Sequence, residues 1–228
     1  MNWNDVLIVG DSFCAARSED WHWPQIFTSE LTGIVYQQNQ FPRGKGFNGA
    51  SWWSSRKQII TQLKKSTPQV AVFFHTESLR IPNDQDWGIN YRSIELKTIH
   101  QTDVDDIPMS ADFALAGKLY YEQLISIDFH EWAVKQWFQE LDQLIKPVEK
   151  VIHLYCFEGI YSKYTFQQGV TLSYPLIKYQ QKTPIFKKHQ ELEANHFTPQ
   201  TNRKFATALA EIIKNYPGNG IRIDTAII

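Results

Sequence analysis

The sequence contains little that would stabilise a small secreted protein or anchor a chain in a membrane. Only two of its 228 residues are cysteines, Cys14 and Cys156, so a disulfide framework is excluded and a reducing compartment fits. No apolar run approaches the roughly 18 residues of a membrane span. The charges nearly cancel, with 23 Lys+Arg against 24 Asp+Glu, and no basic block occurs. These absences predict a globular protein with no nucleic-acid partner and no membrane partner.

The amino-terminal residues carry no sign of a targeting segment. The first five, Met-Asn-Trp-Asn-Asp, include no Lys or Arg, and the apolar run 6–9 is too short for the hydrophobic part of a signal peptide. We therefore expect no signal peptide and a cytoplasmic location. Aromatic residues, in contrast, are abundant at 14% of the chain, and such residues either fill a core or line a recognition surface.

Short apolar runs alternate with helical patterns in the first third of the chain. The runs 6–9, 34–36 and 69–74 have the composition of strands, and helical patterns at 21–31 and 51–65 separate them. Strands that alternate with helices need crossover connections, which favour a parallel sheet covered by helices. An α/β fold is therefore predicted.

The rest of the chain contains fewer clear patterns. Three further elements are predicted: a helix at 112–125, a helix from about Trp132 that ends before Pro147, and a strand at 151–155. Thr198 and Pro199 are typical of a helix start. The segments 76–112 and 156–185 show no firm period and are interpreted as long loop insertions. A single α/β domain over residues 1–228 is the simplest organisation.

A serine follows the first apolar run, in the sequence Gly10-Asp11-Ser12. At the carboxyl end of a first parallel strand, this serine would lie where α/β folds bind ligands. The amino-terminal end of the helix that follows would favour negative charge at the same place. Serine is also a preferred N-cap, so the alternative interpretation is that Ser12 only caps that helix.

A carboxylate and a histidine lie just before the last predicted helix. Glu193 precedes His196 by three residues, across a predicted turn. Such a carboxylate can accept the Nδ1 proton of the imidazole, which leaves the other nitrogen free to act as a base. Combined with Ser12, this pair has the composition of an orienting acid, a base and a nucleophile.

Four blocks in this order resemble those of the SGNH/GDSL hydrolase family. They are Val6–Ser12, Asn48–Ser51, Val70–Glu77 and Glu193–His196. The resemblance implies a flavodoxin-like, three-layer α/β/α fold and ester hydrolysis through an acyl-serine intermediate. It implies that Ser12 is the nucleophile, His196 the base and Glu193, in place of the family's usual Asp, the residue that orients the base.

The resemblance also implies an oxyanion hole, formed by the amides of Ser12 and Gly49 and by the residue at position 77. The family has Asn at this last position, whereas the chain has Glu77, and an ionised carboxylate cannot donate a hydrogen bond. Loss of one such donor costs about 10²–10³ in rate. Three alternatives stay open: Thr76, Asn83 or His75 replaces the donor, Glu77 is held protonated, or the enzyme is slow or inactive.

Further residues near these blocks are candidates for substrate binding. They are Asp11, Arg17, Trp52 and Thr76. Aromatic rings beside a hydrolytic serine can stack on a sugar or hold an acyl chain, although most single rings belong to a core. Arg17 is suited to an acidic substrate group or to a surface ion pair.

The sequence contains partial matches to cofactor and metal motifs, but none of them is complete. Gly44–Gly49 matches G-x-G-x-x-G, but no acidic residue lies about 20 positions further on, as a dinucleotide site requires. The acidic cluster that begins at Asp103 has Pro108 and Ala114 where a calcium loop needs Gly and Glu. The histidines lack the spacing of a helical zinc site. We therefore predict no cofactor and no metal.

Two functions from different classes remain. The first is a serine esterase, such as a carbohydrate deacetylase, acting on a small-molecule or carbohydrate ester. The second is a catalytically weak or inactive binding protein on the same scaffold. Residues 195–202 are similar to those of SGNH-like proteins of tailed phages. This similarity implies a virion-associated location and virion proteins as partners for the binding protein. The tail 221–228 begins with strand-like alternation and is suited to an edge strand, to packing on its own domain or to docking in a homo-oligomer.

Overall fold

The computed structural model describes residues 5–15, 22–33, 50–80, 111–180 and 197–228. Within these residues, five parallel strands form one sheet in the order β1-β2-β3-β4-β5. The strands are β1 (Val6–Ala15), β2 (Val70–His75), β3 (Lys150–Tyr155), β4 (Val170–Leu172) and β5 (Ile221–Ile223). The flavodoxin-like strand order is 2-1-3-4-5. If the strand that comes second along the chain is left out, the remaining four follow one another in chain order, as the described strands do. The predicted strand 34–36 lies outside the described residues.

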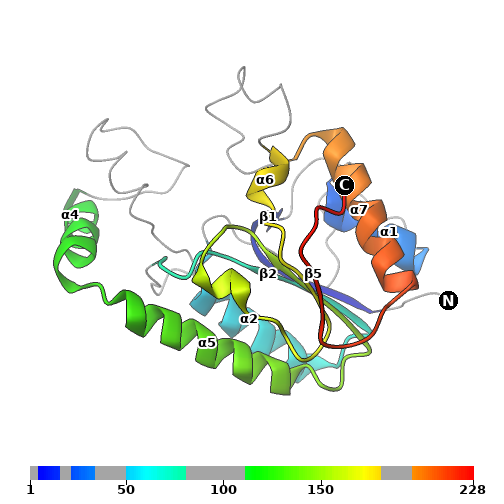
Figure 1. Cartoon of the computed structure of the whole chain (residues 1–228), viewed down its shortest axis with the longest axis horizontal. Coiled ribbons are helices and arrows are strands. Elements are labelled where there is room, and N and C mark those ends of the chain that lie inside the picture. The colour runs from blue at the N-terminus through cyan, green and yellow to red at the C-terminus, as the bar shows by residue number, and fades with distance from the viewer. Residues whose placement is uncertain (1–4, 16–21, 34–49, 81–110, 181–196) are drawn as a thin grey trace.

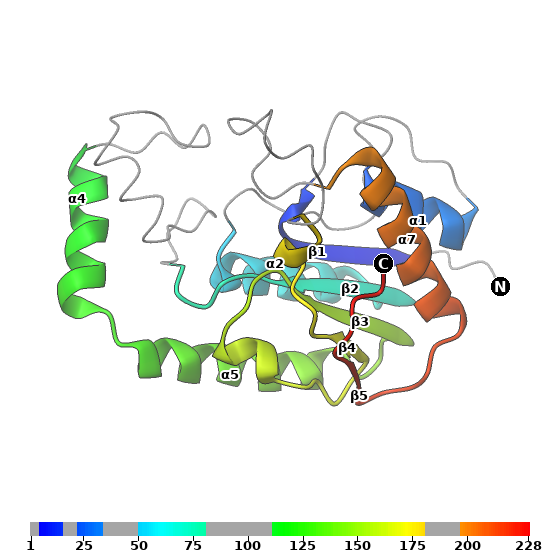
Figure 2. The same cartoon turned by 45° about the horizontal axis from the view of Figure 1, so that its top comes forward.

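Helices cover both faces of the sheet (Figure 1). Helices α1 (Trp23–Thr32) and α7 (Pro199–Lys214) pack on one face, and α2 (Trp52–Lys65) and α5 (Ile127–Leu144) pack on the other. Figure 2 shows the sheet between these two layers. The predicted three-layer α/β/α fold is confirmed. The remaining described helices are α4 (Ala111–Leu119), the π-helix η2 (Tyr120–Leu124), the 3-10 helix η3 (Ile160–Lys163) and α6 (Ile177–Gln180).

The central strands are continuous apolar runs because both of their faces are covered. Every residue of β2 is buried, and β1 pairs with it from Val6 opposite Val70 to Val9 opposite Phe73. At Gly10 the two strands are so close that an added Cβ would lie 2.2 Å from the Cβ of Phe74. Only glycine fits there without displacing β2.

Two helices begin within one residue of the predicted start, and a side chain caps each of them. The Ser51 hydroxyl accepts a hydrogen bond from the Ser54 amide at the start of α2. The Thr198 hydroxyl accepts one from the Thr201 amide at the start of α7, and Pro199 lies in the first turn. These bonds satisfy amides that have no partner within the helix.

The structure differs from the prediction in the segment after Ser12. Strand β1 continues to Ala15, and α1 begins only at Trp23, with His22 as its N-cap residue. The chain stays extended because Phe13 is buried in the core and its carbonyl oxygen accepts a 2.6 Å hydrogen bond from Nε1 of Trp23. Ser12 therefore does not cap α1, and the amino terminus of α1 does not directly follow it.

Two short strands complete the sheet. Strand β4 comes from the segment 156–185, in which the sequence shows no firm period, and it pairs with β3 and β5. Strand β5 confirms the expectation of an edge strand in the tail 221–228. Among the helices in the described part of the chain, none combines the length and apolar character needed to cross a membrane.

Candidate functional site

The carboxyl ends of β1, β2 and β3 meet at one edge of the sheet, which we call the carboxyl edge (residues 11–14, 75–80 and 155–157). In open parallel sheets this is where ligands bind. The main chain of Ser12 lies here within β1, and Thr76 and Glu77 directly follow β2. The structure therefore brings the first and third sequence blocks together.

The segment after Ser12 also meets the segment after His196 at this edge. The buried rings of Phe13 and Phe197 are in contact, with centroids 5.7 Å apart. Phe13 follows Ser12 in the chain, and Phe197 follows His196. Residues from opposite ends of the sequence are thus packed against each other at the carboxyl edge.

A buried asparagine in α7 joins these segments by hydrogen bonds. The Asn202 Nδ2 group donates to the carbonyl oxygens of Phe197, at 2.9 Å, and Thr198, at 3.2 Å. Its Oδ1 accepts from the backbone amide of Trp23, whose indole in turn donates to Phe13. Asn202 and Trp23 therefore connect the start of α7 to Phe13 in β1, and the sequence patterns did not single out either residue for this role.

Replacing Asn202 with aspartate should destabilise this junction with almost no change in shape. The aspartate still accepts from Trp23, but it has no donor for the carbonyl oxygens of Phe197 and Thr198 and it buries a charge. We expect a loss of about 3 kcal/mol, since a buried group without its partner costs about 1–3 kcal/mol and a charged one more. Unfolding in urea measures the change. The exposed Asn215→Asp is the control, and an equal loss there would contradict the assignment.

A carboxylate and two thiols are buried at the end of β1. The Oδ1 atom of Asp11 accepts from the Phe13 amide at 3.0 Å and from the Cys156 thiol at 3.3 Å. Burial raises the pKa of both Cys14 and Cys156, and the charge of Asp11 adds to this effect. Both thiols therefore stay protonated, and neither is suited to act as a nucleophile.

A buried arginine, which the sequence analysis did not identify, lies on the loop after β2. The Nη1 group of Arg80 donates to the Ala50 carbonyl oxygen at 3.1 Å, and the guanidinium carbon lies 5.4 Å from the ring centroid of Phe157. Its Nε atom lies 3.9 Å from a carboxylate oxygen of Glu77, whose side chain is 36% exposed. Arg80 Nε and Thr76 Oγ1 are buried and lack a hydrogen-bond partner among the described residues.

His75 does not supply the missing oxyanion donor. Its Nε2 lies 3.0 Å from Nδ1 of His153, and Nε2 of His153 lies 3.0 Å from the Gln168 carbonyl oxygen. A carbonyl oxygen only accepts, so His153 donates to Gln168 and its Nδ1 accepts the proton of His75. Burial lowers the pKa of His75 to about 3, so its ring is neutral and has no second N–H. This alternative from the sequence is excluded.

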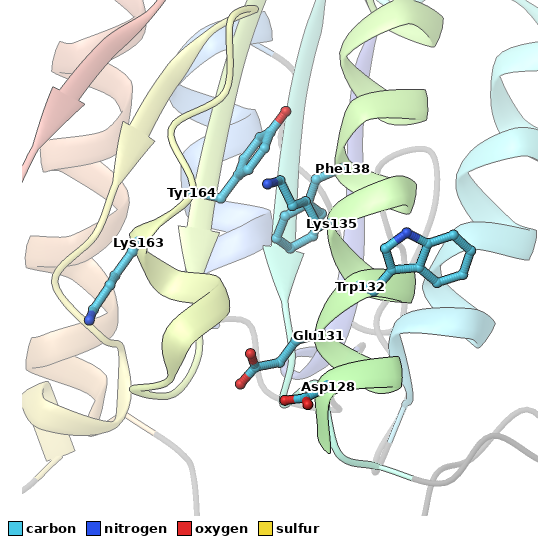
Figure 3. A pocket seen from close by; sticks show the side chains of 7 residues that line it. All are labelled: Asp128, Glu131, Trp132, Lys135, Phe138, Lys163 and Tyr164. Atoms are coloured by element: carbon cyan, nitrogen blue, oxygen red, sulfur yellow. The ribbon is translucent and has the colours of Figure 1, made fainter. Parts of the chain in front are cut away.

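An open pocket of about 500 Å³ lies beside the carboxyl edge, between α5 and the segment after β3 (Figure 3). Lys163 and Tyr164 line the pocket on the side opposite α5, and the Lys163 side chain extends away from α5. Phe138 lines the pocket from α5, and its ring centroid is 4.7 Å from that of His75 at the end of β2. The half-exposed ring of Trp132 also lines this pocket.

Four predicted site residues lie outside the described residues: Arg17, Gly49, Glu193 and His196. Trp52 is the first residue of α2, and its ring contacts Trp53, with centroids 5.6 Å apart. Within the described ranges, no three His, Cys, Asp or Glu side chains gather closely enough to hold a metal ion. No sequence signal pointed to Arg80, because its contacts come from segments distant in the chain.

No protein-family model matches the sequence. Among solved structures, the chain is similar to variants of Axe2 from Geobacillus stearothermophilus. One, described as an acetyl-xylooligosaccharide esterase, is 11% identical with a TM-score of 0.33, and the match covers 67% of this chain and 59% of that chain. A catalytic mutant, described as an acetylxylan esterase, is 10% identical with a TM-score of 0.35, over 98% of this chain and 76% of that one. At these values, the similarity assigns neither a family nor an activity.

Proposed function

We propose that the chain is a serine ester hydrolase of the SGNH type, formed by one domain over residues 1–228. Ser12 is the nucleophile, His196 is the general base, and the Glu193 carboxylate orients the imidazole and stabilises its charged form. The amides of Ser12 and Gly49 donate to the oxyanion.

The contact between Phe13 and Phe197 is the observation that carries this proposal. A nucleophile and its base must come within hydrogen-bond reach of each other, although they are far apart in the sequence. Consecutive Cα atoms are about 3.8 Å apart, so contact between the following residues favours proximity of Ser12 and His196. The hydrogen bonds of Asn202 support the same arrangement.

In the proposed mechanism, His196 removes the hydroxyl proton of Ser12 while the serine oxygen attacks the ester carbonyl carbon. The tetrahedral intermediate collapses, and the departing alcohol takes the proton from His196. Water, activated by the same base, then hydrolyses the acyl-serine. No step needs a metal or an organic cofactor.

A carbohydrate ester is the substrate class that we favour. The pocket beside the carboxyl edge combines aromatic faces, Trp132 and Tyr164, with charged groups such as Glu131 and Lys135. An aromatic ring offers an apolar face to a sugar, while charged and polar side chains can bond to its hydroxyl groups. An acetyl ester is a suitable first substrate because it places little demand on an acyl pocket.

Covalent labelling by a fluorophosphonate tests the nucleophile. Wild type should gain the mass of one phosphonyl group, mapped by peptide mass spectrometry to Ser12, and Ser12→Ala should gain none. Ser126→Ala, at the start of α5, is a matched control and should label like wild type. Absent labelling in the wild type, or equal labelling in Ser12→Ala, would overturn the esterase proposal.

One observation favours a second function. Glu77 supplies a carboxylate where the SGNH pattern has an amide donor, and this carboxylate lies at the carboxyl edge. If wild type is not labelled, a binding protein with vestigial chemistry on the same scaffold becomes the better assignment, and virion association is then the first setting to examine.

A further inference from the structure

The guanidinium of Arg80 is buried where a cation is electrostatically disfavoured. It donates to the carbonyl oxygen of Ala50, which directly precedes Ser51, the N-cap residue of α2. The amino-terminal end of a helix carries partial positive charge, which repels a cation and attracts an anion. A buried arginine at this position adds a full positive charge to the same place.

The described carboxylates offset this charge only in part. Asp11 uses Oδ1 for the Phe13 amide and the Cys156 thiol and forms no ion pair with Arg80 in the described structure. Glu77 is partly exposed, and its closest carboxylate oxygen is 3.9 Å from Arg80 Nε, too far for a strong hydrogen bond. A buried cation with incomplete pairing is costly, so the site has capacity for another anion.

Two buried hydrogen-bonding atoms are available for such an anion. Arg80 Nε and Thr76 Oγ1 belong to the same loop after β2, and neither has a hydrogen-bond partner in the described part of the chain. Phe157 connects this loop to β1, because it lies under the guanidinium and its ring centroid is 6.1 Å from that of Phe13, the neighbour of Ser12. The charge of Arg80 also counteracts the rise in the pKa of Cys156, which bonds to Asp11.

We infer that Arg80, with the Thr76 hydroxyl, stabilises the negatively charged oxygen that forms on the ester carbonyl, in place of the donor that Glu77 cannot supply. This inference rests on the proposed serine esterase function. As the Ser12 oxygen bonds to the carbonyl carbon, the carbonyl π electrons move to the oxygen, and the serine proton goes to His196. Arg80 donates a hydrogen bond and keeps its proton. When the intermediate collapses, those electrons re-form the carbonyl bond and the alcohol leaves.

In this arrangement Glu77 is a counter-ion and not an oxyanion ligand. It balances part of the charge of Arg80 when no substrate is bound. Because its carboxylate is partly exposed, water screens its repulsion of the oxyanion. A glutamate at position 77, where the SGNH pattern has an asparagine, would repel an isolated oxyanion. With Arg80 beside it, this glutamate is compatible with catalysis.

The first test is Arg80→Met, assayed by hydrolysis of p-nitrophenyl acetate. We expect kcat to fall about 10²–10³-fold with KM changed less than about threefold, the pattern for loss of an interaction made in the transition state. Arg222→Met is the control, since Arg222 on β5 likewise donates to backbone carbonyl oxygens, those of Ser162 and Tyr164. Tyr164 lines the pocket proposed for a sugar, and p-nitrophenyl acetate carries no sugar. Its kcat should change less than about twofold.

Two further variants keep the test decisive if Arg80→Met does not fold. Arg80→Lys retains the charge but loses the planar donor group, so its kcat should fall between those of wild type and Arg80→Met. Glu77→Gln removes the competing charge and should raise kcat about twofold to fivefold, whereas a purely structural ion pair predicts no gain.

The outcomes separate the two proposals. Turnover in wild type that disappears in Ser12→Ala, but persists unchanged in folded Arg80→Met, overturns the role of Arg80 and leaves the esterase intact. Unchanged kcat in Arg80→Lys together with a lower kcat in Glu77→Gln overturns it as well. If wild-type turnover does not depend on Ser12, the proposed function itself fails.

Discussion

Hydrolysis of an acetyl ester should fall about 10⁶-fold in His196→Ala, as it should in Ser12→Ala, and no further in the double variant. The nucleophile and base of a hydrolytic triad act as one unit, so the removal of either leaves only binding and oxyanion stabilisation. Initial rates at saturating p-nitrophenyl acetate, corrected for the uncatalysed reaction, measure this dependence. Glu193→Gln should cost less, about 10⁴-fold, because the base can still act without its orienting carboxylate.

A histidine without a role in the proposed chemistry provides the control. His130 on α5 lies 2.7 Å from the Tyr120 hydroxyl, and its ring is close to the backbone of Ser78. His130→Gln should retain turnover. If the losses in Ser12→Ala and His196→Ala multiply in the double variant, the two residues act independently and the proposed triad is wrong. An unchanged rate in Glu193→Gln would contradict only the proposal that the Glu193 carboxylate orients His196.

The elements that could be predicted from the sequence are those with strong local causes. Strand β2 is a run of buried β-branched and aromatic residues, and α7 begins with a capping Thr198 and a first-turn Pro199. Strand β4 could not be predicted because only Val170–Leu172 belong to it, and its extended form depends on hydrogen bonds to β3 and β5. The extension of β1 likewise depends on Trp23, which bonds to Phe13.

The same distinction applies to the site. Patterns within a few residues were enough to propose Asp11, Ser12 and Thr76, because each directly or closely follows an apolar run that is recognisable in the sequence. Arg80 has no local signal, since its position is defined by Ala50 and Phe157 in separate segments. The departure at Glu77 was visible in the sequence, but its ion pair with Arg80 required the fold.

The buried histidine pair should make the protein sensitive to mild acid. Burial lowers the pKa of His75 to about 3, and burial with the neighbouring His75 lowers the pKa of His153 well below its usual value. In the unfolded chain both titrate near 6.5, so the unfolded state binds more protons at lower pH. Their neutral forms contribute full stability above pH 6.5, and this contribution is lost as the pH falls from 6.5 towards about 3.

From pH 7 to pH 5, His75 should lower the free energy of unfolding by about 2 kcal/mol, and His153, whose pKa is lowered in the same direction, should add to this loss. Urea unfolding at both pH values, with the slope checked for constancy, measures this loss. In His75→Phe the loss should be smaller by about 2 kcal/mol, whatever the stability of the variant at pH 7. His130, whose pKa burial also lowers, is present in both proteins and cancels in the comparison. Equal pH dependence in wild type and His75→Phe would mean that His75 binds a proton as readily in the folded protein as in the unfolded chain, which contradicts the neutral pair bonded to Gln168.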